Sequence, residues 1–529
     1  MGSAIRATAV VCAALFVLSC GSTTRPIVRG GIVVRAPVAV TARYASDPPP
    51  ATEEVPALAR VIAASPREGS TEPLVYDARM SRLAEWLLER YPDGRETPRR
   101  EVVDFLAQSL GIVDPTPAVF LVGVDRNAGS FDASVTTFVA QQLARRPYNR
   151  FGVVTAERGA QRLALVVLTS RLVRIEPIAR SGETSRPIVV RGELASGLTT
   201  PSIAVTSPSG AVRSIPAGEG PAFDVRVPAP EPGAYQIEII GRGERGETVL
   251  ANFPVYRGVE PPDHVVVAPT EGTETEPAAV ERELLVLLNR TRRAARLPPL
   301  ESMEALGTVA RAHSRDMIEA GYMGHVSPTT GDAGDRLRGA GVHSGLVLEN
   351  IGRAYSAREI HDGLMASPGH RANMMNPDVT HVGVGVASES EGGRIVFVAT
   401  EVFIRVGRRI DLTRSPQVLL EGINQRRAAL GRPAVRLDAA LSERAAAGAR
   451  AFFSDGDPAP TQEDVLGEVN DSLRRFALAY SRIGAVMAVV VEVEEAAALE
   501  PVLAEGPTVV GIGLAQGDRA QLGRVVAVV

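Results

Sequence analysis

The spacing of hydrophobic residues changes several times along the chain, and the first patterned region mixes helical and strand periods. RMSRLAEWLLERY places Leu83, Trp86, Leu87 and Tyr91 on one helical face, and VVDFLAQSLGI predicts a second helix. RLALVVLTSRLVRI is rich in β-branched residues, which are typical of strands. We therefore predict an α/β domain over residues 73–178.

Residues 181–258 have a different pattern, made of short strands at regular spacing. RPIVVRGELASG, SIAVTSPSG, FDVRVPAP and YQIEIIGRG alternate with Gly, Pro and Ser turns, and the turn EPGAY precedes the last strand. Short strands in this rhythm predict an immunoglobulin-like β-sandwich. We expect this domain to act as a spacer, and we interpret residues 259–279 as a linker.

Helical periodicity returns at residue 280. The segments ERELLVLLNRTRRAA, ALGTVARAHSRDMIEAG and REIHDGLMAS predict three helices. The second ends at Gly321, which fits a C-terminal cap, and the third stops before Pro368. HVGVGVAS and GRIVFVATEVF predict strands. The mixture predicts an α+β domain over residues 280–403.

The C-terminal segment, residues 412–529, repeats this pattern. LLEGINQRRAALGRPAVRLDAALSERAAAGARAFF aligns without gaps on LLVLLNRTRRAARLPPLESMEALGTVARAHSRDM. Identical pairs include Asn289 and Asn424, Arg292 and Arg427, and Pro298 and Pro433. Later, VGVGVA is matched by VGIGLA, and a strand-like run follows each. We interpret the two segments as copies of one domain.

Histidine distinguishes the two copies. The chain has seven histidines, and all but His264 lie between His313 and His381. The second copy has none, and Gly448 stands at the position of His313. If the scaffold required histidine, the second copy should have kept some. The imidazoles of the first copy are therefore candidates for a site.

The first twenty residues, MGSAIRATAVVCAALFVLSC, predict a lipoprotein signal peptide over 1–20. One arginine precedes an apolar run that is too short to span a bilayer. The run ends in VLSC, which resembles a bacterial lipobox whose cysteine, here Cys20, becomes lipidated. An ordinary cleaved signal with a chance cysteine is the alternative. Residues 21–72 are rich in Pro, Ala, Thr and Ser, so we predict a flexible tether there.

Charge and hydropathy restrict the partners. The formal net charge is −4 over 529 residues, so no basic surface for nucleic acid is expected. No segment after the signal is apolar enough to span a membrane. Because no aspartate follows Cys20, we expect a lipid-anchored protein of the cell envelope, in the outer membrane of a Gram-negative bacterium.

Five motifs of the central segment occur in the order HSRDM, GHVSP, LENIGRA, SPGHRANMMNP and HVGVGVA. Together they closely resemble the bacterial branch of the CAP superfamily (SCP/TAPS), which includes cysteine-rich secretory, antigen 5 and pathogenesis-related proteins. The resemblance implies an α-β-α sandwich over 280–403 and a degenerate copy over 412–529. The segment FGVVTAERGAQRLALVVL has the strand-like pattern that ends both copies, and this pattern extends the resemblance, as a more degenerate copy, to residues 73–178. The expected fold class is α+β, with CAP-like sandwiches and one immunoglobulin-like sandwich.

The resemblance also implies a cavity lined by two histidines and acidic residues. By motif, His325, Glu349 and His370 occupy three of these positions, Ser367 lies near the second acidic position, and His313 lies at the cavity edge. Two neutral imidazoles and one carboxylate form a minimal ligand set for a divalent metal such as zinc. A hydrogen-bonded polar cluster that orders the loops is the alternative.

A catalytic role is less favoured by the sequence. The mature chain offers no free cysteine, and Ser367 near His370 and Glu349 lacks a G-x-S-x-G elbow. We therefore expect a non-enzymatic envelope protein whose CAP-like domain binds a small lipid- or sterol-like ligand, a metal or an envelope component. The alternatives are a metal-assisted hydrolase acting on envelope material and a purely structural surface protein.

The lipobox interpretation predicts that Cys20→Ser abolishes membrane anchoring. The serine hydroxyl cannot take the thioether-linked lipid, so the variant should leave the membrane fraction or accumulate as uncleaved precursor. Fractionation and incorporation of an acyl label measure the effect. A variant that fractionates like the wild type, with no acyl label in either protein, contradicts the prediction.

Overall fold

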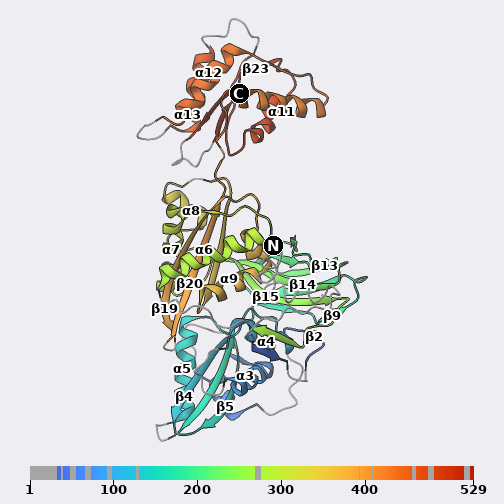
Figure 1. Cartoon of the computed structure of the whole chain (residues 1–529), viewed down its shortest axis with the longest axis vertical. Coiled ribbons are helices and arrows are strands. Elements are labelled where there is room, and N and C mark those ends of the chain that lie inside the picture. Colours follow the sequence, from blue (N-terminus) through green and yellow to red (C-terminus); the bar gives the residue numbers. More distant parts are fainter. Residues whose placement is uncertain are drawn as a thin grey trace, which may run out of the picture.

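The computed structural model describes residues 32–36, 40–47, 55–65, 73–91, 98–126, 130–267, 276–342, 344–391, 394–407, 409–454, 460–474, 482–517 and 525–529. The predicted signal peptide, with Cys20, lies outside these residues. Within them, no helix combines the length and apolarity needed to cross a bilayer. Figure 1 shows the central domain between an N-terminal domain and a C-terminal domain, with a domain of two β-sheets beside it.

The N-terminal domain contains one four-stranded sheet covered by helices. Its elements are α2 (Ala57–Ala63), β3 (Val75–Tyr76), α3 (Ala78–Arg90), α4 (Arg100–Ser109), β4 (Ala118–Asp125), α5 (Phe131–Arg145), β5 (Arg150–Arg158) and β6 (Gln161–Thr169). The strand order is β3-β5-β6-β4, and β3 pairs parallel to β5 while the other pairs are antiparallel. Helix α3 lies where the pattern predicts it, with Leu83 and Leu87 fully buried.

Residues 173–257 form two sheets that share one core. Their strands are β7 (Val173–Ile175), β9 (Ser181–Gly182), β10 (Ile188–Leu194), β11 (Thr199–Thr206), β12 (Val212–Pro216), β13 (Ala222–Val227), β14 (Gly233–Gly243) and β15 (Gly246–Arg257), while β8 (Ile178–Ala179) lies outside both sheets. The sheet orders are β13-β10-β7 and β12-β11-β14-β15-β9. Val190 of the first sheet and Ile237 and Phe253 of the second belong to the same buried cluster. We call this region the two-sheet domain.

The central domain has three layers, helix, sheet and helix. Its elements are α6 (Pro277–Ala294), β17 (Glu301–Ser302), α7 (Glu304–Glu319), α8 (Ala333–Gly339), β18 (Val347–Ala354), α9 (Ala357–Met365), α10 (Pro368–Met374), β19 (His381–Glu391) and β20 (Arg394–Ile404). The strand order is β17-β19-β20-β18. Helices α6 and α9 bury apolar side chains on one face of the sheet, and α7 and α8 do so on the other.

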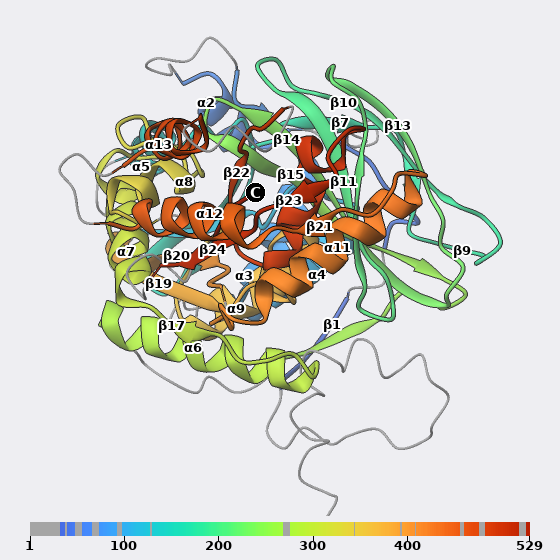
Figure 2. The same cartoon turned by 90° about the horizontal axis from the view of Figure 1, so that it is seen from above.

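The C-terminal domain follows the same order of elements. These are α11 (Ser415–Ala429), β21 (Arg436–Leu437), α12 (Ala439–Ala451), α13 (Gln462–Arg474), β22 (Met487–Val490), η3 (Val493–Ala498), α14 (Glu500–Leu503), β23 (Val509–Val510), β24 (Gly513–Gln516) and β25 (Val525–Val528). Strand β21 pairs parallel to β23, as β17 does to β19, and β25 lies between β22 and β24. Figure 2 shows α11 and α12 from above.

One buried arginine organises the same turn in the central and C-terminal domains. Arg292 Nε donates to Pro298 O at 2.9 Å, and its Nη1 donates to the carbonyls of Met374 and Asn376. Arg427 makes the equivalent bonds to Pro433 O, Val502 O and Ala504 O, which are its counterparts by element order. Both arginine side chains are fully buried. Each therefore donates the hydrogen bonds that several backbone carbonyls would otherwise receive from water.

Strand glycines let the second helix press against the sheet in each α/β unit. A Cβ on Gly385 would lie 2.0 Å from Arg311 N of α7, and a Cβ on Gly513 would lie 2.0 Å from Ala445 C of α12. In the N-terminal domain, a Cβ on Gly152 would lie 2.2 Å from Ser81 N of α3. This close approach accounts for the glycines of the VGVGVA and VGIGLA motifs.

The region predicted as a flexible tether, 21–72, is partly ordered. β1 (Ile32–Arg35) pairs with β16 (His264–Val267), which lies in the predicted linker, and β2 (Arg43–Tyr44) pairs with β8. Tyr44 is fully buried with its ring 4.8 Å from that of Phe253. The prediction of a flexible tether was wrong for these segments. A few apolar side chains suffice to order a segment where neighbouring domains supply a sheet edge to pair with and a core to pack against.

The buried arginine of the C-terminal domain generates a stability prediction. Arg427→Met should lower the free energy of unfolding of this domain, because each carbonyl left without a donor costs about 1–3 kcal/mol. Domain-resolved hydrogen exchange measures the loss. The adjacent Arg426 is exposed, so Arg426→Met is the matched control and should change little. Equal behaviour of the two variants would contradict the role given to Arg427.

Candidate functional site

The predicted site residues fall into two neighbouring groups. The first, which we call the His325 cluster, joins the GHVSP loop to β18 and α8. His325 Nδ1 lies 2.9 Å from Glu349 Oε1, and Arg336 Nη2 donates to Glu349 Oε2 at 2.5 Å. Asp332 and Asp335 form a capping box at the start of α8, the helix that carries Arg336. The Glu349 carboxylate is thus held by one imidazole and one guanidinium group.

His313 completes this cluster from α7. Its side chain is fully buried, its Nε2 lies 4.0 Å from Glu349 Oε1, and its Nε2–H donates to Gly324 O at 3.0 Å. His313 Nδ1 is buried and has no hydrogen-bond partner among the described residues. Burial lowers the pKa of His313, so its imidazole is neutral near pH 7. His313 therefore fixes the loop that carries His325.

The electrostatics of the cluster favour an ionised Glu349. Burial alone would raise the pKa of this carboxyl, but the hydrogen bond with His325 and the charge of Arg336 outweigh it and bring the pKa below its usual 4.5. Glu349 is almost fully buried, with 4% of its side chain exposed, whereas His325 is 28% exposed. The cluster is a buried ion pair with one imidazole at its surface.

The second group, which we call the His370 chain, crosses a domain boundary. Ser367 Oγ–H donates to Glu238 Oε1 at 2.6 Å, and Ser367 Oγ lies 2.7 Å from His370 Nδ1. Glu238 belongs to β14 of the two-sheet domain, while Ser367 and His370 belong to the turn and helix of SPGHR. Gly369 N–H also donates to Glu238 Oε2, at 2.9 Å. A carboxylate of another domain therefore caps α10.

Burial has opposite effects on the two ionisable groups of the chain. It raises the pKa of Glu238 to about 7, against the smaller effects of the bonds from Ser367 and Gly369 and the charge of Arg100. It lowers the pKa of His370 to about 3, helped by His325 and Arg100. At neutral pH, His370 is therefore an uncharged imidazole, and Glu238 is near the midpoint of its titration.

The expected metal set is not supported. His325 and Glu349 are brought together, but His370 directs Nδ1 at Ser367 and belongs to the second group. Within the residues that the structure describes, no group of three or more His, Cys, Asp or Glu side chains is placed to hold a metal ion. The physical reason is that Arg336 donates a hydrogen bond to Glu349 Oε2, so this carboxylate pairs with a guanidinium cation instead of a metal.

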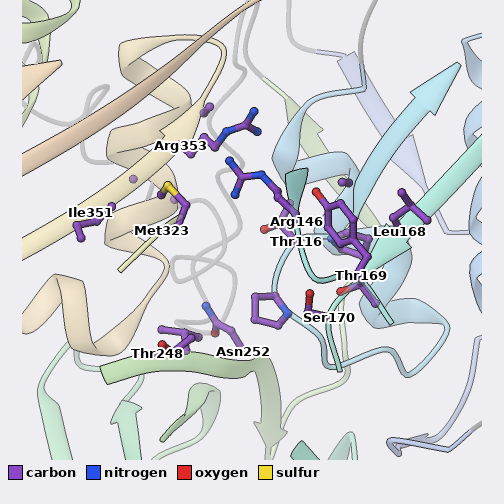
Figure 3. A pocket seen from close by; sticks show the side chains of 18 of the residues that line it. Thr116, Arg146, Leu168, Thr169, Ser170, Thr248, Asn252, Met323, Ile351 and Arg353 are labelled. Atoms are coloured by element: carbon purple, nitrogen blue, oxygen red, sulfur yellow. The ribbon is translucent and has the colours of Figure 1, made fainter. Parts of the chain in front are cut away.

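His370 lies on the wall of a large cleft. The cleft has a volume of about 920 Å³ and is lined by the N-terminal, two-sheet and central domains. Most of the lining side chains are apolar, including Leu168, Met323 and Ile351, and the polar ones include Asn252 (Figure 3). The His325 cluster lies outside this lining. Of the predicted site residues, only Ser367 and His370 reach the cleft.

Two arginines face each other in the cleft from different domains. Arg146 of the N-terminal domain and Arg353 of β18 lie close together in Figure 3. Burial lowers the pKa of Arg146, and the positive charge of Arg353 lowers it further. Arg353 is paired with Glu389 at 3.1 Å and Glu391 at 3.0 Å, whereas Arg146 is 3.9 Å from Glu389. This end of the cleft is polar, and Arg146 is its less tightly paired cation.

Sequence reasoning missed Arg336 and Glu238. The capping-box pattern DAGD predicts a short helix, yet it does not say whether Arg336 or Arg338 turns inward. Alternation in YQIEIIGRG places Glu238 on the outer face of the two-sheet domain. Only the packing of α10 against that face buries it. No local signal identifies a residue that acts in the site of another domain.

Comparisons with known proteins identify the family of the central domain. The model of the cysteine-rich secretory protein (CAP) family matches residues 285–401. The central domain is a CAP domain. Bacillus subtilis (strain 168) has two similar proteins: the uncharacterised protein YkwD, 37% identical over 120 residues, and the uncharacterised membrane protein YlbC, 38% identical over 107 residues. The matches cover 22% and 20% of this chain.

The chain spans about half of YkwD, 47%, and 31% of YlbC. A solved extracellular protein of Bacillus anthracis containing an SCP domain is 22% identical, with a TM-score of 0.23. That match covers 44% of this chain and 88% of the other. The similarity to the two curated relatives thus concerns the CAP domain and not the whole chain.

The buried ion pair of the CAP domain predicts the effect of Glu349→Gln. The substitution leaves Arg336 buried without a counter-ion, which should cost about 3–5 kcal/mol of unfolding free energy. Because the folded-state pKa of Glu349 lies below its usual 4.5, the carboxylate stabilises the fold above pH 4.5. This contribution is lost as the pH falls through the folded-state pKa.

Chemical denaturation at several pH values measures both effects. Glu349→Gln should be less stable than the wild type at neutral pH, and the difference should shrink in acid. Glu319→Gln, at an exposed position of α7, is the matched control. If Glu349→Gln is as stable as this control, the cluster does not stabilise the CAP domain.

Proposed function

We propose that the protein binds a small, largely apolar ligand in the cleft between its first three domains, without catalysing a reaction. The observation that carries this proposal is the cleft itself, about 920 Å³ in volume and lined mainly by apolar side chains. Such a volume is within the range of ligand sites, which combine apolar walls with a few polar groups. His370 and Arg146 supply polar groups here.

The same geometry argues against the rival functions. A metal-assisted hydrolase needs a metal ligand set, and Glu349 is engaged by Arg336. A serine nucleophile needs its oxygen at the reacting atom, whereas Ser367 is buried between Glu238 and His370, with 4% of the residue exposed. A binding site requires only that the walls be preformed, and three packed domains preform them.

We further propose that the protein acts in the cell envelope, held by lipid on Cys20. The sequence motif VLSC supports the anchor, and the presence of a CAP domain is consistent with an extracellular or surface protein. An anchored binding protein would hold an apolar ligand close to the membrane from which such molecules come.

Filling the cleft tests the binding proposal. Ile351→Trp places a larger side chain into the cleft and should weaken the binding of an apolar fluorescent probe, such as a naphthalene sulfonate or a fluorescent fatty acid, at least about tenfold. Ile395, on the adjacent strand β20, is 42% exposed and outside the cleft lining, so Ile395→Trp is the matched control and should bind normally.

The probes also separate the alternatives. Equal binding by both variants means that the probe binds elsewhere and the proposal is wrong. If the wild type binds no apolar probe and both variants fold normally, the purely structural role is favoured.

A further inference from the structure

Glu238 joins two domains, and it is also linked to the cleft-lining His370 through hydrogen bonds that share the single hydroxyl proton of Ser367. Ser367 has one hydroxyl proton and lies within hydrogen-bond distance of both Glu238 Oε1 and His370 Nδ1. The proton can be given to only one of them at a time. The choice at Ser367 therefore decides whether His370 Nδ1 is a donor or an acceptor.

An ionised Glu238 sets this choice. The distance of 2.6 Å between Ser367 Oγ and Glu238 Oε1 is typical of a hydroxyl donating to a carboxylate, about 2.5–2.7 Å. Ser367 Oγ can then only accept from His370, so the imidazole proton lies on Nδ1 and the lone pair on Nε2. His370 Nε2 has no hydrogen-bond partner among the described residues, and His370 lines the cleft. A ligand that reaches Nε2 would then meet a lone pair.

A protonated Glu238 reverses every bond of the chain. Oε2 continues to accept from Gly369 N–H, so the added proton lies on Oε1 and points at Ser367 Oγ. The serine hydroxyl must then donate to His370 Nδ1. A neutral imidazole carries one proton, which moves to Nε2. The cleft now meets an N–H donor in place of a lone pair.

We propose that Glu238 of the two-sheet domain is a positioning residue for the cleft of the CAP domain, selecting through Ser367 which tautomer of His370 the ligand meets. This inference deepens the proposed function and rests on it for its ligand. An ionised Glu238 favours apolar ligands that offer an O–H or N–H donor, and a protonated Glu238 favours ligands that offer an acceptor.

The surroundings place this exchange near neutral pH. Arg100 of α4 is the charged group that acts on Glu238 and His370 from the N-terminal domain, and His325 of the GHVSP loop also acts on His370. The cross-strand neighbours of Glu238 on β11 and β15, Ala204 and Asn252, are uncharged. Burial raises the pKa of Glu238 to about 7, while His370 itself stays neutral.

The test is the tautomer of His370 in the full chain without ligand. Protein labelled with ¹⁵N-histidine is followed by two-bond ¹H–¹⁵N correlation spectra between about pH 5.5 and about pH 8.5, a range that brackets the titration of Glu238. His370→Gln identifies the resonance. We expect Nδ1–H at the alkaline end, Nε2–H at the acid end, and a midpoint near 7 without formation of imidazolium.

Two variants and one control complete this experiment. In Glu238→Gln, the amide oxygen must accept from Gly369 N–H, so its NH₂ faces Ser367 and holds Nε2–H on His370 at every pH. Ser367→Ala breaks the chain and should also remove the pH dependence. Glu247→Gln, at an exposed acid of the same domain, should titrate like the wild type. A wild-type tautomer that is independent of pH, or Glu238→Gln spectra like the wild type, overturns the proposal.

A ligand comparison separates this inference from the proposed function. At the alkaline end, 1-decanol should bind the wild type about two- to tenfold more tightly than decyl methyl ether, which has no donor, and Glu238→Gln should lose this preference. If neither probe binds while the tautomer titrates, the proposed function fails and the positioning by Glu238 stands. If both bind the wild type equally, His370 does not select the ligand.

Discussion

A carboxylate can be buried between two domains only if protein groups replace the water that it loses, and the Glu238 carboxylate meets this condition across an interface. Ser367 and Gly369 of the CAP domain supply the donors, so the two-sheet domain and α10 must keep one relative position. That position places His370 on the wall of the cleft, which residues of both domains line. The site depends on an interface more than on any single domain.

Much of the fold follows from local patterns, and the failures have physical causes. The amphipathic periods predicted helices where α3, α6 and α7 lie, and the order of the motifs identified the CAP domain. Contacts between segments far apart in sequence were missed. Tyr44, in a Pro-rich segment, is buried only because the two-sheet domain offers Phe253. The metal hypothesis omitted Arg336, whose inward direction depends on tertiary packing.

The C-terminal domain shows how the same architecture is stabilised without histidine. Gly448 occupies the position of His313, and a Cβ there would lie 2.3 Å from Val469 of α13. Helix α13 therefore packs closely on α12, and Leu441, Ala445 and Val465 form the contact. The CAP domain fills the corresponding region with the His325 cluster. The same scaffold is thus stabilised by apolar packing in the C-terminal domain and by a buried ion pair in the CAP domain. This comparison is consistent with a structural role for the His325 cluster.

The pairing of β1 with β16 has a mechanical consequence. Ile32 is opposite Val267, so the start of β1 lies beside the end of β16. Tension applied at the N-terminal end and at the CAP domain would pass directly between these two residues. The chain of the N-terminal and two-sheet domains lies in the loop that the pair closes, so the backbone path of the tension bypasses it while the pair holds, and Val34 and Val267 of the pair are packed in the core of the N-terminal domain. Because the pull acts on adjacent ends of an antiparallel pair, its bonds would open one after another at low force, before the cleft is disturbed.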